Sequence, residues 1–195
     1  MGHHFRHLTV GSAAWSSADW EDAWSPYDDG TYDAALRFIR PDDVVLDIGA
    51  GDLRFALRAA ACARAVIAIE RRADLLRRQT PPNVDILCGD ALSLSFTRGV
   101  TVAVLLMRHC AHFADYVAKL QAAGIRQLVT NARWGMDVEC VSLTPLHAFD
   151  DAPPGWYACL CGAVGFKPCW PEQVTATLLA LVSQVKDCPA CTGRV

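Results

Sequence analysis

The sequence has no long apolar run. No stretch of its 195 residues approaches the roughly 20 consecutive apolar residues that cross a bilayer. Residues 1–15 also contain no apolar segment of the length found in signal peptides. These absences argue against a membrane protein and a secreted one, so a cytoplasmic protein with no membrane partner is expected.

Positive charge is also scarce. The 18 lysines and arginines are outnumbered by 21 aspartates and glutamates, and the net charge is −3. Because nucleic-acid binding depends mainly on neutralising phosphates, the net charge does not support a nucleic-acid partner. A local basic patch stays open as an alternative. Arg71, Arg72, Arg77 and Arg78 form either a solvated helix face or a phosphate contact.

Internal repeats and low-complexity linkers are absent as well. From residue 31 the chain alternates short, apolar, β-branched runs with amphipathic segments. This alternation is typical of βαβ units. The predicted fold class is therefore α/β, with a doubly wound, mostly parallel sheet. Strands are expected over 42–49, 65–70, 83–90, 101–107 and 125–132, and helices over 31–39 (with Thr31 as N-cap), 53–63, 71–79 and 112–124.

Three parts are expected along the chain. Residues 1–30 form an N-terminal arm packed on the core, and no function is assigned to its histidines. Residues 31–150 form the main domain. Its sheet is expected to end in a shortened hairpin, because the alternation of strand and helix patterns stops after Ala132. Residues 151–195 form a C-terminal element with a helix over 171–185. Pro171 suits the first turn of this helix, and its apolar stripe consists of Val174, Leu178, Leu179 and Val182.

A glycine loop follows the first predicted strand. The stretch VVLDIGAGDLRF places Gly49 and Gly51 between an apolar strand and a helix start. Glycine lets a ligand approach the backbone, and the helix end offers unpaired N–H groups. A dinucleotide fingerprint has a third glycine five residues after the first, but Arg54 stands there. The acid two residues before the first glycine, Asp47, points to another ligand.

At these residues the chain resembles the class I S-adenosylmethionine-dependent methyltransferases, whose first motif reads acid-x-Gly-x-Gly. The resemblance covers residues 31–132, and Leu53 stands at an optional glycine of the motif. It implies a Rossmann-like domain that binds S-adenosylmethionine through Asp47, Gly49, Gly51, Glu70, Asp90 and Ala91. In this family Glu70 would bind the ribose hydroxyls, Asp90 the adenine amine, and the Ala91 amide the ring. The structural alternative is a parallel-sheet protein with acids at strand ends by chance, since turns and N-caps favour aspartate.

The methyl acceptor should lie beyond the ends of strands four and five. His109 is a candidate general base, because the ordinary pKa of histidine lies near neutrality, and Arg108 is a candidate clamp for an anionic substrate. The alternative is that His109 and His112 only cap or flank the following helix. Cys110 is a weaker candidate nucleophile, and Arg133 marks the end of strand five. The Asn/Asp-Pro-Pro-aromatic motif of related adenine and glutamine methyltransferases is absent here, so amino-group methylation of that kind is not predicted.

The cysteines are unevenly distributed. Nine is an odd number, and without a secretory signal a disulfide framework is not expected. Five of them fall within residues 159–191, in the pairs Cys159/Cys161 and Cys188/Cys191 with Cys169 between. Two such pairs present four thiolates to one zinc ion and resemble zinc-ribbon knuckles. Two alternatives stay open: Cys169 replaces one ligand, or Cys188-x-x-Cys191 is a redox pair, which normally begins a helix.

The resulting hypothesis is an S-adenosylmethionine-dependent methyltransferase with a structural Zn²⁺ site. The acceptor is unidentified and could be RNA, a protein or a small molecule. The alternative function is a non-catalytic interaction module built on a methyltransferase scaffold, with the zinc element making the partner contact. A nicotinamide-dependent oxidoreductase is disfavoured by Arg54.

Overall fold

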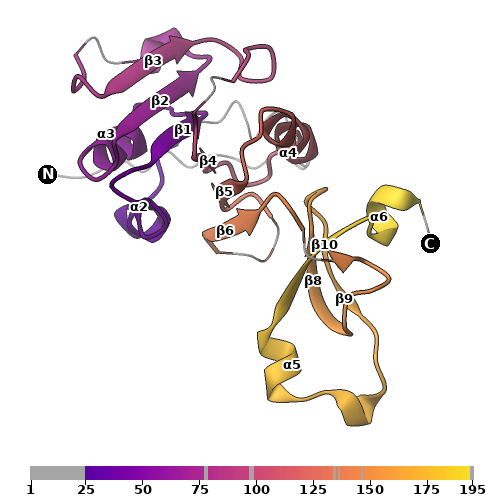
Figure 1. Ribbon diagram of the computed structural model, residues 1–195. Helices are drawn as coiled ribbons and strands as arrows, with labels where there is room; N and C mark the ends of the chain where they lie inside the picture. The colour runs from indigo at the N-terminus through magenta and orange to yellow at the C-terminus, as the bar shows by residue number, and fades with distance from the viewer. Residues whose placement is uncertain are drawn as a thin grey trace, which may run out of the picture.

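The computed structural model describes residues 25–76, 79–96, 99–133, 135, 137–145 and 147–193. These ranges form two sheets, one of six strands and one of four. The four-stranded sheet belongs to a C-terminal lobe, residues 147–193, which lies beside the larger body in Figure 1. The histidines and tryptophans of residues 1–24, predicted to belong to an arm, lie outside the described residues. No helix within the described ranges is both long and apolar enough to cross a membrane.

The six-stranded sheet confirms the predicted α/β class. Its strands lie in the order β3-β2-β1-β4-β5-β6. The first five are parallel, and β6 runs antiparallel to β5. The sheet therefore ends in a hairpin, as expected. The bounds are β1 Val44–Ile48, β2 Ala65–Glu70, β3 Val84–Cys88, β4 Val102–Leu105, β5 Gln127–Thr130 and β6 Glu139–Ser142.

Helices cover both faces of this sheet, which makes it doubly wound (Figure 1). Helices α2 (Asp29–Leu36) and α3 (Arg54–Ala60) pack on one face, and α4 (Phe113–Ala122) packs on the other. Neighbouring strand residues point to opposite faces. Val45 accordingly joins the core under α2 and α3, whereas Leu46 joins the core under α4. Burial on both faces explains why the strands read as continuous apolar runs.

Two helix predictions in the body need correction. Asp28, not Thr31, is the N-cap of α2, and its carboxylate accepts hydrogen bonds from the amide and hydroxyl of Thr31. The helix expected over 71–79 is wrong in its first part, where only a 3₁₀ turn, η1 (Ala73–Leu75), forms. No residue of η1 is buried. Of the segment 71–76, only Leu76 packs against the core under α2 and α3, which is little for a helix, since tertiary packing supplies most helical stability.

The C-terminal lobe contains the largest error. The expected helix over 171–185 is instead a 3₁₀ turn η2 (Pro171–Gln173), a short helix α5 (Ala176–Ala180) and strand β10 (Val182–Lys186). Strand β10 pairs in parallel with β7 (His147–Ala148) and β8 (Gly155–Cys159), and β8 pairs antiparallel with β9 (Val164–Lys167). The β-branched residues of 182–186 suit a strand. As a strand between β7 and β8, the segment also buries Val185 completely.

Candidate functional site

A cleft of about 540 Å³ opens at the carboxyl ends of the parallel strands. Its walls are the loops that follow β1, β2, β3 and β4. The strand order reverses direction between β1 and β4. Ligands of doubly wound sheets bind at such a switch point, where the two loops diverge to opposite faces. The cleft therefore lies where the sequence predicted the cofactor.

The loop after β1 makes a tight turn at the base of the cleft. Gly49 and Gly51 have φ angles of +72° and +54°, which favour glycine. A Cβ atom on Gly49 would lie 2.9 Å from the Met107 side chain, on the loop after β4. Leu53 also has a positive φ, +68°, and is fully buried. Leu53, which stands at the motif's optional third glycine, thus adopts a left-handed backbone conformation although its side chain belongs to the core.

Asp47 provides the clearest sign of a missing partner. Its carboxyl group is buried at the cleft wall, and among the described residues its Oδ2 atom has no hydrogen-bond partner. Burial, reinforced by the charge of Glu70, raises the pKa of Asp47 to about 7. A buried, unpaired carboxylate is costly. A cationic group bound beside Asp47 would remove that cost.

The other two acids line the same cleft and also hold its loops in place. The Glu70 carboxylate accepts hydrogen bonds from the amides of Gly51 and Arg72, both at 2.8 Å. Asp90 accepts from the amide of Leu92 at 2.9 Å. Each carboxylate oxygen has two acceptor sites, so both acids can accept further hydrogen bonds from a ligand. Of the predicted cofactor residues, Asp47, Gly49, Glu70, Asp90 and Ala91 line the cleft, and Gly51 reaches it through Glu70.

The candidate acceptor residues lie on the loop after β4. Arg108 and His109 both line the cleft. His109 has a positive φ of +60°, an uncommon conformation for a residue with a side chain and one enriched at functional sites. His112 occupies the N-cap position of α4, and its ring lies 3.1 Å from the Asp115 carboxylate. Cys110 packs against the core under α4 rather than lining the cleft.

Sequence reasoning missed the aromatic side of the cleft. Tyr27, Tyr32 and Phe55 line it, and the Tyr27 and Tyr32 rings meet edge to face with centroids 6.4 Å apart. The Tyr27 hydroxyl accepts a hydrogen bond of 2.8 Å from the Arg108 amide, and the Arg108 guanidinium lies over the Tyr27 ring. No periodicity or motif indicates that residue 27 reaches residue 108, so only the folded chain reveals this contact.

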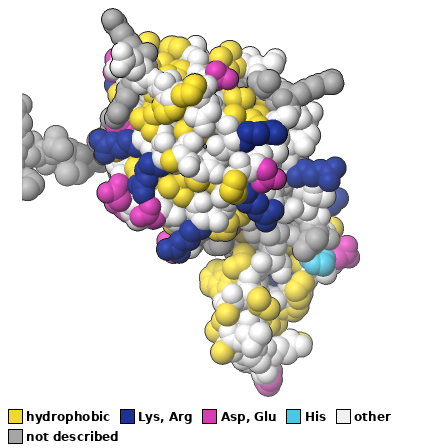
Figure 2. All heavy atoms as spheres, turned by 60° about the vertical axis from the view of Figure 1, so that its left-hand side comes forward, with side chains coloured by type: hydrophobic (Ala, Val, Ile, Leu, Met, Phe, Trp, Pro, Cys, Tyr) yellow, Lys and Arg dark blue, Asp and Glu magenta, His cyan; other side chains and the backbone are white. Residues whose placement is uncertain are grey.

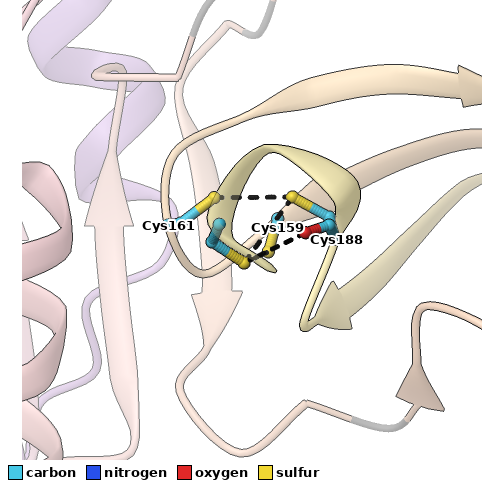
Figure 3. A group of neighbouring side chains, drawn as sticks. Cys159, Cys161 and Cys188 are labelled. Atoms are coloured by element: carbon cyan, nitrogen blue, oxygen red, sulfur yellow. Dashed lines mark hydrogen bonds between the residues drawn. The ribbon is translucent and has the colours of Figure 1, made fainter. Parts of the chain in front are cut away.

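A second candidate site is the cysteine cluster of the C-terminal lobe, shown in Figure 3. The sulfur atoms of Cys159, Cys161, Cys188 and Cys191 all lie within 4.8 Å of one another. Three of the separations are 4.0 Å (159–191), 3.6 Å (161–188) and 3.8 Å (188–191). Tetrahedral zinc with Zn–S bonds of about 2.3 Å places sulfurs about 3.8 Å apart, whereas a disulfide needs about 2.05 Å. The cluster thus has the dimensions of a metal site.

The cluster also joins the lobe to the body. Gly162 closes the turn after the first pair at a φ of +96°, and its amide donates to the Cys159 carbonyl at 3.0 Å. Leu160, inside that turn, packs into the core under α4. Cys169 does not belong to the cluster within the described ranges. The second pair lies on a single helical turn, α6 (Pro189–Thr192), which Cys188 precedes as the N-cap residue and which ends one residue after Cys191.

Arg133 does not line the cleft, although its place at the end of strand five made it a candidate to do so. Its guanidinium is buried and forms an ion pair with Glu139 on β6. It also donates a hydrogen bond of 2.9 Å to the Gln184 side chain on β10. Arg133 therefore links the six-stranded sheet to the lobe.

Comparisons with known proteins show similarity of fold alone. No protein-family model matches the sequence, and no curated protein is significantly similar to it. Solved structures with a similar fold include a dimethyladenosine transferase from Plasmodium falciparum (19% identity, TM-score 0.45, 53% of this chain and 41% of that one). A precorrin-8w decarboxylase from Methanobacterium thermoautotrophicum is also similar (18%, 0.48, 55% and 64%).

A third is an S-adenosylmethionine-dependent methyltransferase from Thiobacillus denitrificans in complex with S-adenosyl-L-homocysteine (19%, 0.44, 57% and 52%). This chain therefore spans between 41% and 64% of the length of these three structures. At such identities and coverages the likeness identifies neither a substrate nor a partner.

Proposed function

We propose that the chain binds S-adenosylmethionine in the cleft and transfers its methyl group to an acceptor held beside His109. The observation that carries the proposal is the buried carboxylate of Asp47, whose Oδ2 atom has no hydrogen-bond partner among the described residues, beside the glycine loop at the switch point of the sheet. S-Adenosylmethionine carries an ammonium group that would pair with this carboxylate. The cleft volume of about 540 Å³ falls within the range of small-molecule sites, roughly 300–1,000 Å³.

The residues present fit the rest of the cofactor. Glu70, held by two backbone amides, would accept hydrogen bonds from the two ribose hydroxyls. Asp90 and the backbone amide of Ala91 lie on the same wall and would bind the adenine edge. Gly49, at a φ of +72°, has no side chain and would let the methionine portion pass close to the backbone.

The protein would contribute placement and proton handling. The bound cofactor supplies an electrophilic methyl group, so the chain must hold a nucleophile in line with it and exclude water. His109, on the cleft wall, would take a proton from the attacking atom as methyl transfer proceeds. Arg108, fixed through its amide to Tyr27, would hold an anionic part of the acceptor. The acceptor class, whether RNA, protein or small molecule, is left open.

Titration of the protein with S-adenosylmethionine and S-adenosylhomocysteine in a calorimeter tests the proposal. We expect micromolar binding, about −8 kcal/mol. Asp90→Ala should weaken it by about tenfold or more, because hydrogen bonds to a charged group contribute about 1.5–3 kcal/mol. Asp85→Ala is the matched control, since Asp85 is an exposed acid on β3 outside the cleft. Failure of both ligands to bind the folded protein would contradict the proposal.

The proposal also predicts how affinity depends on pH. Asp47 has a pKa raised to about 7, so it is mostly neutral at pH 6 and must lose its proton to pair with an ammonium group. Each pH unit below that pKa then costs up to about 1.4 kcal/mol. Affinity should rise about tenfold between pH 6 and pH 7.5, with proton release on binding. Asp47→Asn should bind S-adenosylmethionine weakly at both pH 6 and pH 7.5. If its affinity rose with pH as much as that of the unaltered protein, the assignment of Asp47 would be refuted.

We also propose that the four-cysteine cluster binds Zn²⁺ as a structural ion. Four thiolates complete a tetrahedral shell and leave no open position for substrate. The ion would hold the turn at Cys159–Gly162 against α6, and so hold the lobe against α4 through Leu160.

A further inference from the structure

Exposed hydrophobic side chains are concentrated on one part of the molecule. Of the nine large hydrophobic residues that the described ranges leave exposed, seven lie between residues 156 and 182. Figure 2 shows the C-terminal lobe, at the bottom, mostly in yellow and white, whereas lysine, arginine and acidic side chains gather on the body above it. The apolar surface consists of Trp156, Phe166, Trp170, Val174, Leu179, Leu181 and Val182. Monomers rarely expose so many large hydrophobic side chains together.

The surface has a defined architecture. Val182, Trp156 and Phe166 are register partners across β10, β8 and β9, so they lie side by side on one face of the small sheet. The opposite face is closed by the segment 149–152, where Phe149 packs edge to face on Tyr157. The remaining members lie on the connection from β9 to β10. Trp170 and Leu181 are the most exposed, at 75% and 64%.

Charge is almost absent from this surface. Between residues 168 and 185 the sequence carries a single charged side chain, Glu172. Two lysines flank this range. Lys167 has its ammonium group bound to the carbonyls of Phe149, Asp150 and Ala152, and Lys186 is exposed at the end of β10. Nucleic acid would need cations to neutralise its phosphates, and this surface supplies none from 168 to 185. An uncharged surface also generates little repulsion between identical copies.

A sheet edge lies next to the apolar row. Strand β9 ends the order β7-β10-β8-β9, and its outer edge meets no other strand of the described ranges. Such an edge is a template for pairing with another strand. Because β9 carries Phe166, pairing of β9 with β9 of a second copy would continue both the sheet and its apolar face across a two-fold axis.

We propose that this surface is the interface of a homodimer formed by a second copy of the chain. The contact is isologous, the commonest arrangement in homo-oligomers. Its core is apolar and depleted of charge, as expected for a permanent interface. The proposal does not depend on the methyltransferase assignment.

Two measurements test the proposal: light scattering coupled to gel filtration, and sedimentation velocity at protein concentrations of roughly 1–100 μM. The expected mass is twice the 21.2 kDa of one chain. Trp170→Asp and Leu181→Asp should raise the dimer dissociation constant by about 100-fold or more, because a charge would be buried against an apolar partner. Their side chains are mostly exposed, so neither change should prevent folding.

Phe38→Asp and Leu87→Asp are matched controls. They place the same charge at exposed hydrophobic positions outside the lobe and should leave the dimer intact. A monomeric mass for the unaltered protein throughout the concentration range would overturn the proposal. So would a dimer that the control variants weaken as much as the lobe variants. A monomer that floats with phosphatidylcholine vesicles would assign the surface to lipid instead.

Discussion

Removal of the proposed zinc ion is expected to unfold the C-terminal lobe. Structural zinc sites supply roughly 10–16 kcal/mol of apparent folding free energy in small zinc domains, and the lobe has little else to stabilise it. Its own buried cluster comprises Ala152, Cys159, Val185 and Cys188, two of which are proposed metal ligands. Cys188→Ser, or a strong chelator, should therefore abolish amide-exchange protection across 147–193 while the six-stranded sheet stays protected.

Cys169→Ser provides the matched control, because Cys169 lies in the same lobe but outside the cluster. This variant should retain one zinc ion per chain by elemental analysis and the same exchange pattern as the unaltered protein. If the purified protein held no zinc, and the chelator changed neither exchange nor melting temperature, the metal assignment would be wrong. The redox alternative would then be tested by the reduction potential of Cys188 and Cys191.

Arg133→Met is expected to lower the free energy of unfolding by about 3–5 kcal/mol, because it leaves a buried carboxylate without its partner. The side chains of Arg133 and Glu139 are 0% and 13% exposed, and their ion pair is bidentate. For a chain of this size the loss corresponds to a fall in Tm of about 6–20 °C. Thermal and urea unfolding, followed by circular dichroism, would measure it.

Two further variants separate the causes of this loss. Arg133→Met combined with Glu139→Gln should recover much of the stability, because the unpaired charge is removed. Gln184→Ala removes only the hydrogen bond from Arg133 to the lobe and should cost about 1 kcal/mol. A double variant as unstable as Arg133→Met alone would show that lost packing, not the unpaired carboxylate, causes the effect.

The body of the fold was largely predictable. The runs that became β1, β2, β4 and β5 are apolar and β-branched, and they are buried because helices cover both faces of the sheet. The prediction of a helix over 171–185 failed because most of its apolar side chains are not buried in a core. The stripe Val174, Leu178, Leu179 and Val182 satisfies helical spacing, yet all of its side chains except Leu178, which is half-buried, are exposed. Spacing alone could not tell a core-facing helix from a connection followed by a strand.

The cleft was predictable for a geometric reason. Carboxyl ends of parallel strands meet at one edge of a sheet. Asp47, Glu70 and Asp90 lie near the carboxyl ends of three neighbouring strands, so they line one cleft. The cysteine pairs were predictable because their spacing in tight turns is itself local. Tyr27 was not predictable, because its contact with Arg108 joins residues far apart in the chain.

The sequence by itself determined the features that local pattern controls: the succession of strands along the chain of the body, the glycine turn after β1, the acids near the strand ends and the two cysteine pairs. Tertiary structure alone decided the strand conformation of 182–186, the contact of Tyr27 with Arg108 at the cleft, and the pairing of Arg133 with Glu139 and Gln184 instead of the cleft. The physical reason is that each of these depends on a partner distant in the chain. Hydrogen bonds, burial and charge pairing with that partner outweigh the weak preferences of the local residues.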